Sequence, residues 1–384
     1  MARMWDAVVV GLGAMGMSTL WQLATRGARV LGVERHSVAH DRGSSHGGSR
    51  IVRKAYFEHP NYVPLLTRAD ELWEELERES RTRIVHRCGV LYGGASTSSV
   101  LAGVKSSAAM HAIDIESLTP TGAARRFPAL LGCAEPVDEF LLEPNAGFAR
   151  PERAITAMAE VASRAGAHIR LQARVDSWRE DDGTIEVCMQ GRVERAQTLI
   201  LAAGAWTPTL LPDTARVITN TGQVMAWVTP RAPGSCDEHS LPAFFIERDS
   251  GPPIYGVPMA SDQPGEQGVK VGFHGGGSLC DPDSMDRVVT DAERMQFSQA
   301  LARAVPGAAG SVSAARVCIY SSSPDDHFII DRVSTSASVF AAFGMGGHGF
   351  KFSPVIGSAL ADLAMTGHTE LPIGFLGKKR LGLG

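Results

Sequence analysis

The stretch Asp6–Arg35, DAVVVGLGAMGMSTLWQLATRGARVLGVER, decides the fold class of this chain. The apolar run Ala7–Val10 is typical of a buried parallel strand, and a helix pattern follows over Met17–Thr25. A second apolar run, Ala28–Val33, ends at Glu34. A strand, a glycine-rich turn, a helix and a second strand in this order predict a βαβ unit of a doubly wound α/β fold.

Three glycines in the turn, Gly11, Gly13 and Gly16, have the G-x-G-x-x-G spacing. The first glycine permits a tight turn, the second lets the backbone approach a pyrophosphate, and the third lets the helix pack closely on the strand. Glu34, about 20 residues further on, can accept hydrogen bonds from ribose hydroxyls. We therefore predict a site for NAD or FAD rather than NADP, and the motif alone does not separate the first two.

The composition is that of an ordinary globular protein, because 44% of the 384 residues are hydrophobic and 20% are charged. The formal net charge of -4 gives no reason to expect a nucleic-acid or membrane partner. No run of about 18 apolar residues predicts a membrane span. The six cysteines form no CxxC pair, so we expect neither a metal site nor a disulfide framework. The N-terminal residues do not have the pattern of a signal peptide, and we expect a cytoplasmic protein.

Two later segments repeat the passage from an apolar strand into a glycine-rich turn. The first is Thr198–Ala203, which runs into Gly204, and the second spans residues 338–367 and continues into a helix pattern. Another helix is predicted over Pro151–Ala165, with proline in its first turn. The segments between them are mixed or strand-like, with many prolines and glycines.

We therefore predict an α/β (α+β) fold with two interleaved domains. A Rossmann-like nucleotide-binding domain is assigned residues 1–81, 146–209 and 326–384. A substrate domain, built on a mixed and largely antiparallel sheet, is assigned residues 82–145 and 210–325.

Strand alternation gathers several polar side chains on common faces. In GVKVGFHG, residues 268–275, alternation puts Lys270, Gly272 and His274 on one face of a strand. The same parity puts Cys318 and Tyr320 together in ARVCIYSS. Farther toward the N-terminus, Arg50 and Arg53 are three residues apart, which makes them neighbours if this segment is a helical turn.

Each of these residues also has a simpler structural explanation. Lys270 and His274 would equally suit the solvent face of an amphipathic strand, and Arg50 and Arg53 a solvated helix surface. Free cysteine is often an inert core residue, and a tyrosine such as Tyr320 is usually a packed aromatic side chain. The segment GMGGHGFK would suit an exposed loop that carries His348 and Lys351. No single residue decides between these alternatives.

Five motifs in order resemble a known family. They are the glycine turn, GSSHGGSRIVR (43–53), GVKVGFH (268–274), CIYSSSPDDHFIID (318–331) and GGHGFKFSP (346–354). Together they resemble the monomeric sarcosine oxidase and N-methyltryptophan oxidase family, FAD-dependent amine oxidases of the D-amino-acid-oxidase-like superfamily. The resemblance extends over nearly the whole chain and implies FAD rather than NAD.

The resemblance also implies roles for individual residues. Cys318 matches the cysteine bonded through sulfur to the 8α carbon of the flavin, and Lys270 matches the lysine near flavin N5 on the face where oxygen reacts. Arg53 and Lys351 match the pair that holds the substrate carboxylate, and Gly347 borders the substrate amine. His274, Tyr255 and Tyr320 match residues of the substrate cavity, and His46 and Arg50 match basic groups beside the isoalloxazine. The remaining cofactor positions are Gly11, Gly13, Gly16, Glu34, Ser45, Val175, Gly346 and Gly349.

The function that the resemblance implies is oxidation of secondary N-methyl amino acids such as sarcosine. Hydride passes to FAD, oxygen becomes hydrogen peroxide, and the imine product hydrolyses to an aldehyde and an amine. The family also implies a monomer whose partners are a small amino acid and O2. Alternatives are an FAD-dependent dehydrogenase, an oxidase of a larger or cyclic amine (N-methyltryptophan, pipecolate or a glycated amino acid), and a non-catalytic nucleotide-binding protein.

Overall fold

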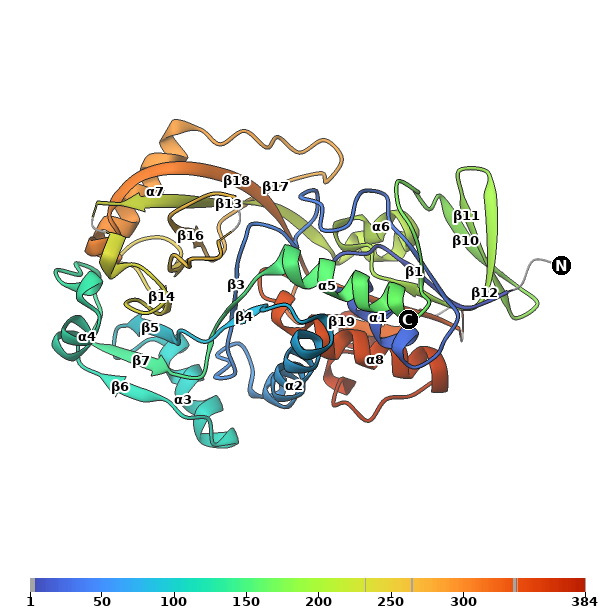
Figure 1. Ribbon diagram of the computed structural model, residues 1–384, viewed down its shortest axis with the longest axis horizontal. Coiled ribbons are helices and arrows are strands. Elements are labelled where there is room, and N and C mark those ends of the chain that lie inside the picture. The colour runs from blue at the N-terminus through green and yellow to red at the C-terminus, as the bar shows by residue number, and fades with distance from the viewer. Residues whose placement is uncertain (1–3, 232, 264, 334–335, 337, 384) are drawn as a thin grey trace.

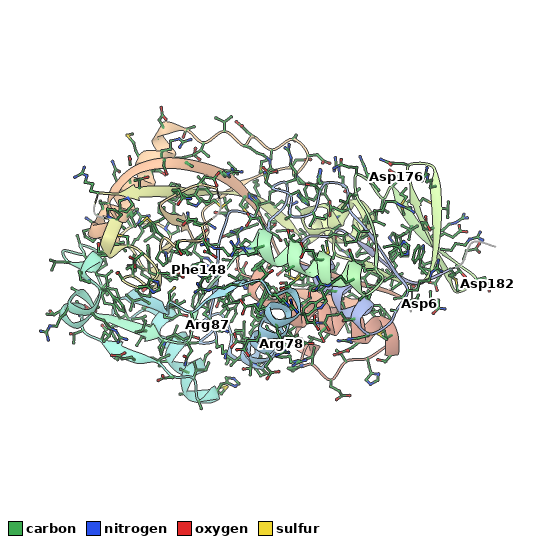
Figure 2. All side chains as sticks on the ribbon, in the orientation of Figure 1. Asp6, Arg78, Arg87, Phe148, Asp176 and Asp182 are labelled. Carbon is green, nitrogen blue, oxygen red and sulfur yellow. The ribbon has the colours of Figure 1, made fainter. Side chains whose placement is uncertain are left out.

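The computed structural model describes residues 4–231, 233–263, 265–333, 336 and 338–383 (Figure 1). The molecule is elongated, with one large sheet toward each end and helices α1, α5 and α8 against the sheet that carries β1. Side chains fill the space between these layers (Figure 2): Phe148 is fully buried, whereas Asp182 at the tip of a hairpin is exposed. The mixed α/β fold confirms the predicted fold class.

The first sheet contains the glycine turn and is parallel at its centre. Its strands, within the described residues, are β1 (Trp5–Val10), β2 (Val30–Val33), β9 (His168–Arg170), β10 (Ser177–Asp181), β11 (Thr184–Met189), β12 (Arg192–Leu201), β19 (Ile329–Arg332) and β20 (Val339–Phe343). Strand β1 lies between β2 and β12 and is parallel to both, and β20 is parallel to β12 on its other side. The predicted βαβ unit is confirmed, with helix α1 over Ala14–Thr25.

Strand β1 is apolar on both faces, and a helical layer covers one of them. Ala7 and Val9 belong to a core cluster with residues of α1, α2 (Val63–Ser80), α5 (Pro151–Arg164) and α8 (Ser353–Thr366). Val8 and Val10 point to the opposite face and pack with residues of β11 and β12. Burial on both faces is what the continuous apolar run of a parallel strand requires.

The glycine turn brings α1 against the strand at very short range. Gly11 has a positive φ of 86°, a conformation that favours glycine. A side chain at Gly16 would overlap the carbonyl oxygen of Gly11, so the third glycine of the motif is required for this approach. The N-terminus of α1 is therefore fixed at the end of β1.

The second sheet is largely antiparallel, as predicted. Its strands are β5 (Val90–Gly94), β6 (Glu116–Leu118), β7 (Glu139–Glu143), β13 (Thr219–Pro230), β14 (Ala243–Ile246), β15 (Ile254–Val257), β16 (Val269–Phe273), β17 (Ser278–Leu279) and β18 (Gly310–Ser322). Helix α7 (Asp291–Ala304) packs on it through Phe297 and Leu301. The other helices are α3 (Ser99–His111), α4 (Pro120–Arg126) and α6 (Thr207–Leu210). The strands of each large sheet lie within the residue ranges assigned above to one domain; the domain boundaries themselves stay a prediction.

A small third sheet corrects one expectation from the sequence. Strand β3 (Arg50–Val52) pairs with β8 (Gly147–Ala149), which also pairs with β4 (Val85–His86). The predicted helical turn that carries Arg50 and Arg53 is therefore wrong. Spacing alone could not detect the partner strand β8, which lies about a hundred residues away in the sequence and sets the extended conformation.

The close contact at Gly16 makes a testable prediction. Gly16→Ala lowers the free energy of unfolding by about 2 kcal/mol or more, because the added methyl group forces α1 away from β1. Gly374→Ala is the control, since a side chain there meets no atom within 4 Å. Urea denaturation followed by tryptophan fluorescence measures both. Equal stabilities of the two variants would contradict the packing role of Gly16.

Candidate active site

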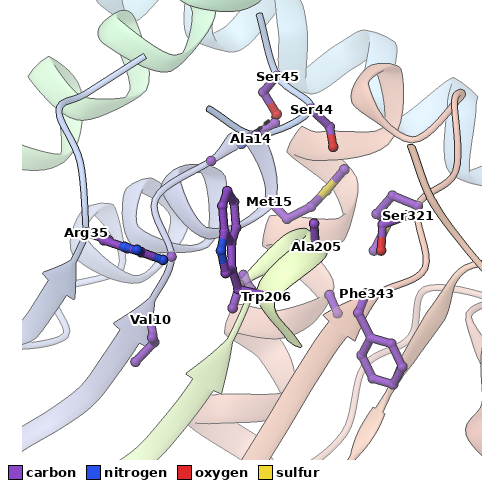
Figure 3. Close-up of a pocket in the computed structure, with 18 of the residues that line it drawn as sticks. Val10, Ala14, Met15, Arg35, Ser44, Ser45, Ala205, Trp206, Ser321 and Phe343 are labelled. Atoms are coloured by element: carbon purple, nitrogen blue, oxygen red, sulfur yellow. Dashed lines mark hydrogen bonds between the residues drawn. The ribbon is translucent and has the colours of Figure 1, made fainter. Parts of the chain in front are cut away.

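The first cavity lies where the glycine turn meets the ends of the parallel strands. Figure 3 shows it beside β1, with the loop that carries Ser44 and Ser45 on one side and Trp206 next to Arg35. Among the predicted cofactor positions, the lining residues are Gly11, Gly13, Glu34, Ser45, Val175, Gly346 and Gly349. Gly16 is not among them, and its part is the packing of α1. The cavity therefore lies where a dinucleotide motif is expected to hold its ligand.

Glu34 ties the turn to the end of β2. Its carboxylate accepts hydrogen bonds from the backbone N–H groups of Leu12 at 2.7 Å and His36 at 2.9 Å. Burial alone would raise the pKa of Glu34, but His40 and these N–H groups lower it below its ordinary value. The ionised carboxylate lines the cavity, and each of its oxygens can accept more than one hydrogen bond.

A second cavity adjoins the first, because Arg50, Tyr320, Gly347 and Phe350 line both. Its walls come from parts of the chain that are distant in sequence. The predicted residues that line it are Arg50, Arg53, Tyr255, His274, Cys318, Tyr320, Gly347 and Lys351. Lys270 and His46 do not line either of these two cavities and lie behind their walls. Cys318 and Tyr320 share a face of β18, as strand alternation predicted.

Two buried cations and one unpredicted carboxylate dominate one end of the second cavity. Arg53 donates to both oxygens of Glu58, at 2.6 and 2.7 Å, and its guanidinium lies between the rings of Tyr56 and Phe57. Burial alone would raise the pKa of Glu58, but Arg53 and other nearby cationic groups lower it to about 2. Glu58 lies in the segment FEHPNY; its position five residues after Arg53 is the signal that could have found it.

Lys351 completes this cationic end. Its ammonium is buried and donates to the carbonyl oxygen of His348 at 2.7 Å. Burial and the charge of Arg53 lower the pKa of Lys351 to about 7, although Glu58 acts in the opposite direction. The alternative of an exposed loop at Lys351 is wrong.

Arg50 lies in the wall that the two cavities share, and Lys270 lies behind this wall. Lys270 is 2% exposed and donates to the carbonyl oxygen of Ser49 at 2.6 Å, so a solvent-facing Lys270 is excluded. Val269 and Val271 pack in the core on the other face of β16, as alternation predicted. The guanidinium of Arg50 lies 3.5 Å from the sulfur of Cys318, whose thiol is free.

His46 is buried, and neither ring nitrogen has a hydrogen-bond partner among the described residues. Burial and the positive charges of Arg50 and Lys270 lower the pKa of His46 to about 2, so its imidazole is neutral. A neutral imidazole offers one N–H donor and one nitrogen lone pair rather than a positive charge.

The remaining wall of the second cavity is aromatic. The ring of His274 is 5.4 Å from that of Phe245 and 6.4 Å from that of Phe57, and burial lowers the pKa of His274. Tyr320 lies directly over Gly347, where a side chain would overlap its ring. Sequence reasoning missed Phe245, because nothing in a short apolar stretch such as β14 marks it as part of a cavity wall.

The geometry defines a class of protein. A glycine turn that cradles a dinucleotide, next to a cavity with buried cations and aromatic walls, is the arrangement of a nucleotide-dependent oxidoreductase. The model of the FAD dependent oxidoreductase family matches residues 6–363, and the chain belongs to this family.

Relatives of this family resemble the chain over its whole length. The monomeric sarcosine oxidase of Streptomyces avermitilis is 39% identical and covers 99% of both chains. The N-methyl-L-tryptophan oxidase of Salmonella dublin is 32% identical and covers 94% of this chain and 95% of its own. The solved structure of NikD, described as an unusual amino acid oxidase, has a TM-score of 0.84 at 25% identity and covers 98% of both chains. The predicted family and enzyme class, an FAD-dependent amine oxidase similar to sarcosine oxidase, are confirmed.

The residues present fit FAD. Gly11 and Gly13 line the first cavity with no side chain of their own, and Cys318, which lines the adjoining cavity, has a free thiol beside Arg50. Within the described residues, no helix is long and apolar enough to cross a membrane.

The ion pair of Glu58 makes the stability of the protein depend on pH. A carboxylate whose pKa is depressed in the folded state stabilises at pH values above its unfolded pKa and loses this effect as the pH falls. Wild type is expected to exceed Glu58→Gln in unfolding free energy by about 3 kcal/mol at pH 7, and the difference shrinks below about pH 4.5. Urea denaturation at pH 7 and pH 4 measures it.

Glu71→Gln is the matched control, because its ion pair with Arg68 is on the exposed face of α2. Such a pair contributes about 0.5 kcal/mol or less. A stability difference at Glu58 that stays constant between the two pH values would contradict the buried ion pair.

Proposed function

We propose that this protein is an oxidase of small secondary amino acids of the sarcosine type, which uses FAD attached to Cys318 and O2 as the electron acceptor. The single observation that carries the proposal is the buried pair Arg53 and Lys351 at one end of the second cavity. The names of the relatives, sarcosine oxidase and N-methyl-L-tryptophan oxidase, agree with a substrate that has a carboxylate and a secondary amine.

The cations suit a carboxylate for physical reasons. A guanidinium offers a two-pronged fit to a carboxylate, and the ammonium of Lys351 adds a second positive charge. In this structure Arg53 already holds a carboxylate, that of Glu58, with both oxygens in hydrogen-bond distance. A substrate carboxylate that enters from the cavity therefore shares or replaces this interaction.

Aromatic side chains and Gly347 then set the pose of the amine. With the carboxylate fixed at one end, the rest of a small amino acid extends toward Gly347 and Tyr320, which border both cavities. Orientation of this kind lowers the barrier because the reacting atoms are held in place before reaction. The neutral imidazole of His274 can accept a hydrogen bond from the amine, and Phe245 beside it excludes water.

FAD, when bound, supplies the redox chemistry: it takes hydride from the carbon next to the amine and returns electrons to O2. The protein supplies charge around it. Arg50 lies in the wall that the two cavities share, and the buried Lys270 lies behind it, so positive charge at these positions is suited to stabilise negative charge that develops beside them. We assign Lys270 the reaction with oxygen, and Tyr255, Tyr320 and His46 the shaping of the site.

The aromatic wall of the second cavity favours a small substrate over the larger alternatives. Phe57, Phe245 and His274 pack against one another in this wall, and an indole or a sugar placed between them would have to separate these rings. We further propose that residues 1–81, 146–209 and 326–384 form the FAD-binding domain, residues 82–145 and 210–325 the substrate domain, and that the protein works as a monomer.

An anaerobic screen tests the substrate. Sarcosine is expected to bleach the flavin absorbance, with an apparent second-order rate constant at least about a hundredfold above that for dimethylamine, which lacks the carboxylate. Arg53→Met should remove most of this preference, whereas Arg68→Met on the exposed face of α2 should keep it. N-methyl-L-tryptophan and pipecolate complete the panel.

Equal rates for sarcosine and dimethylamine would contradict carboxylate recognition. A faster reaction with N-methyl-L-tryptophan would favour the larger substrate. An unchanged flavin spectrum with every compound would favour the non-catalytic alternative. If reduction is fast but the reduced protein reacts with an artificial acceptor and hardly with O2, it is a dehydrogenase.

The attachment of FAD to Cys318 is tested by acid precipitation. The wild-type pellet should keep its yellow colour, because a thioether survives the loss of the fold, and Cys318→Ala should release the colour to the supernatant. Cys236→Ala is the control, since this buried cysteine does not line either of the two cavities. A colourless wild-type pellet would contradict the linkage.

A further inference from the structure

Residues at the N-terminus of helix α5 form hydrogen bonds with the backbone of the segment Gly47–Ser49. The carboxylate of Glu152 accepts hydrogen bonds from the N–H groups of Gly47 at 2.5 Å and Gly48 at 3.1 Å. Arg150, the residue before the helix, donates to the carbonyl oxygen of Gly48 at 2.9 Å. The carboxylate of Glu152 thus binds two N–H groups of the segment, and the guanidinium of Arg150 binds a carbonyl group of the same segment.

The conformation of this segment makes these hydrogen bonds specific. Gly47 and Gly48 have positive φ values of 98° and 73°, which turn two successive N–H groups toward one anion. Glu152 is in the first turn of α5, where the helix dipole stabilises a negative charge. The segment is thus built to receive a carboxylate.

The next carbonyl of the same segment holds Lys270. The ammonium of Lys270 donates to the carbonyl oxygen of Ser49 at 2.6 Å. Glu152 therefore reaches Lys270 through two residues of backbone. Lys270 is 2% exposed, so its position depends on this contact and on the packing of β16.

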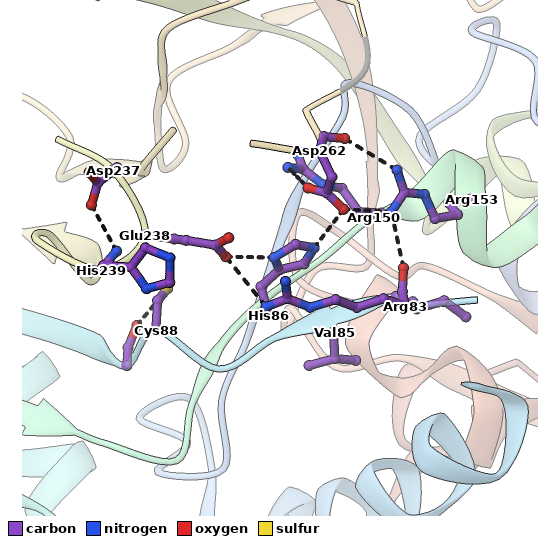
Figure 4. A network of polar contacts seen from close by, with 12 residues as sticks. Arg83, Val85, His86, Cys88, Arg150, Arg153, Asp237, Glu238, His239 and Asp262 are labelled. Atoms are coloured by element: carbon purple, nitrogen blue, oxygen red, sulfur yellow. Dashed lines mark hydrogen bonds and ion pairs between the residues drawn. The ribbon is translucent and has the colours of Figure 1, made fainter. Parts of the chain in front are cut away.

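Arg150 is itself fixed on its outer side, as Figure 4 shows. It donates to Asp262 at 2.8 Å, and the other oxygen of Asp262 lies 3.2 Å from His86 and 2.6 Å from Arg153. His86 is fully buried and also lies 2.6 Å from Glu238. The network joins the segment that connects β15 and β16 to the start of α5, so Arg150 has little freedom to move.

We propose that Glu152 and Arg150 are positioning residues for the reaction with oxygen: they fix the segment Gly47–Ser49, which holds Lys270, and Glu152 supplies the negative charge that keeps this lysine cationic. The proposal rests on the proposed role of Lys270. Neither residue lines the two cavities, so neither is expected to touch substrate.

The charged groups around Lys270 act on its pKa in opposite directions. Burial and Arg50 lower the pKa of Lys270 well below its ordinary value, and Arg150 lowers it further. Glu152 and Cys318 act in the opposite direction. His46 on the same loop is neutral, and the ring of Trp227 on β13 lies 6.0 Å from the ammonium. Removal of the charge of Glu152 therefore lowers the pKa of Lys270.

Hydrogen exchange of the holoenzyme tests the hydrogen bonds of Glu152. Glu152→Ala should speed the exchange of the Gly47 and Gly48 amides at least about tenfold, because both lose their acceptor. Glu152→Gln keeps an acceptor oxygen and should restore most of the protection. Glu160→Gln, an exposed residue on the same helix, is the control. Unchanged exchange in Glu152→Ala would overturn the role of these hydrogen bonds.

Stopped-flow kinetics of the two half-reactions test the charge. In Glu152→Gln, the rate constant for reoxidation by O2 should fall at a pH about one unit lower than in wild type. Anaerobic reduction by sarcosine should stay within about twofold, which a general structural defect would not produce. Arg150→Met should slow reoxidation severalfold more than reduction.

Lys270→Met distinguishes a failure of the proposed role of Lys270 from a failure of the proposed role of Glu152. If this variant reoxidises at the wild-type rate, the proposed role of Lys270 fails and the positioning role fails with it. If Lys270→Met is slow but the pH profile of Glu152→Gln matches that of wild type, only the role of Glu152 is overturned. A slow Lys270→Met together with the shifted profile supports both.

Discussion

Buried positive charge is the constraint on which this structure depends. Arg50, Arg53, Lys270 and Lys351 lie within or directly behind the walls of two adjoining cavities. A cation removed from water is stable only when anions or hydrogen-bond acceptors compensate it. The chain supplies part of this compensation: Glu58 pairs with Arg53, and the carbonyl oxygens of Ser49 and His348 accept from the two lysines. An anionic cofactor and an anionic substrate would supply more, so the site and the stability of its surroundings are coupled.

The residues around the two cavities come from separate elements of the fold. The glycine turn fixes α1 at the end of β1 and defines the first cavity, while β18 brings Cys318 and Tyr320 to the second. Strand β3 places Arg50 where the two cavities meet. Each element is stabilised by packing far from the site, in the helical layer on the first sheet and under α7 on the second. The cations can therefore be held against their mutual repulsion.

The sequence was sufficient for the parts of this arrangement that follow from local periodicity or from a motif. The βαβ unit, the shared face of Cys318 and Tyr320 and the alternation around Lys270 all follow from short-range geometry. The conformation at Arg50 did not, because a partner strand about a hundred residues away decides it. Phe245 was missed for a related reason: whether an apolar residue lines a cavity depends on what folds against it.

The depressed pKa of Lys351 has a consequence for how ligands enter. Burial and the charge of Arg53 make this amine lose its proton more easily than an exposed lysine does. Any carboxylate that settles beside it favours the ammonium form, so binding draws a proton in from the buffer. The affinity for such ligands accordingly weakens as the solution becomes alkaline, and each departing anion returns its proton. Occupancy of the cavity and acidity of the medium are thus thermodynamically linked through one amine.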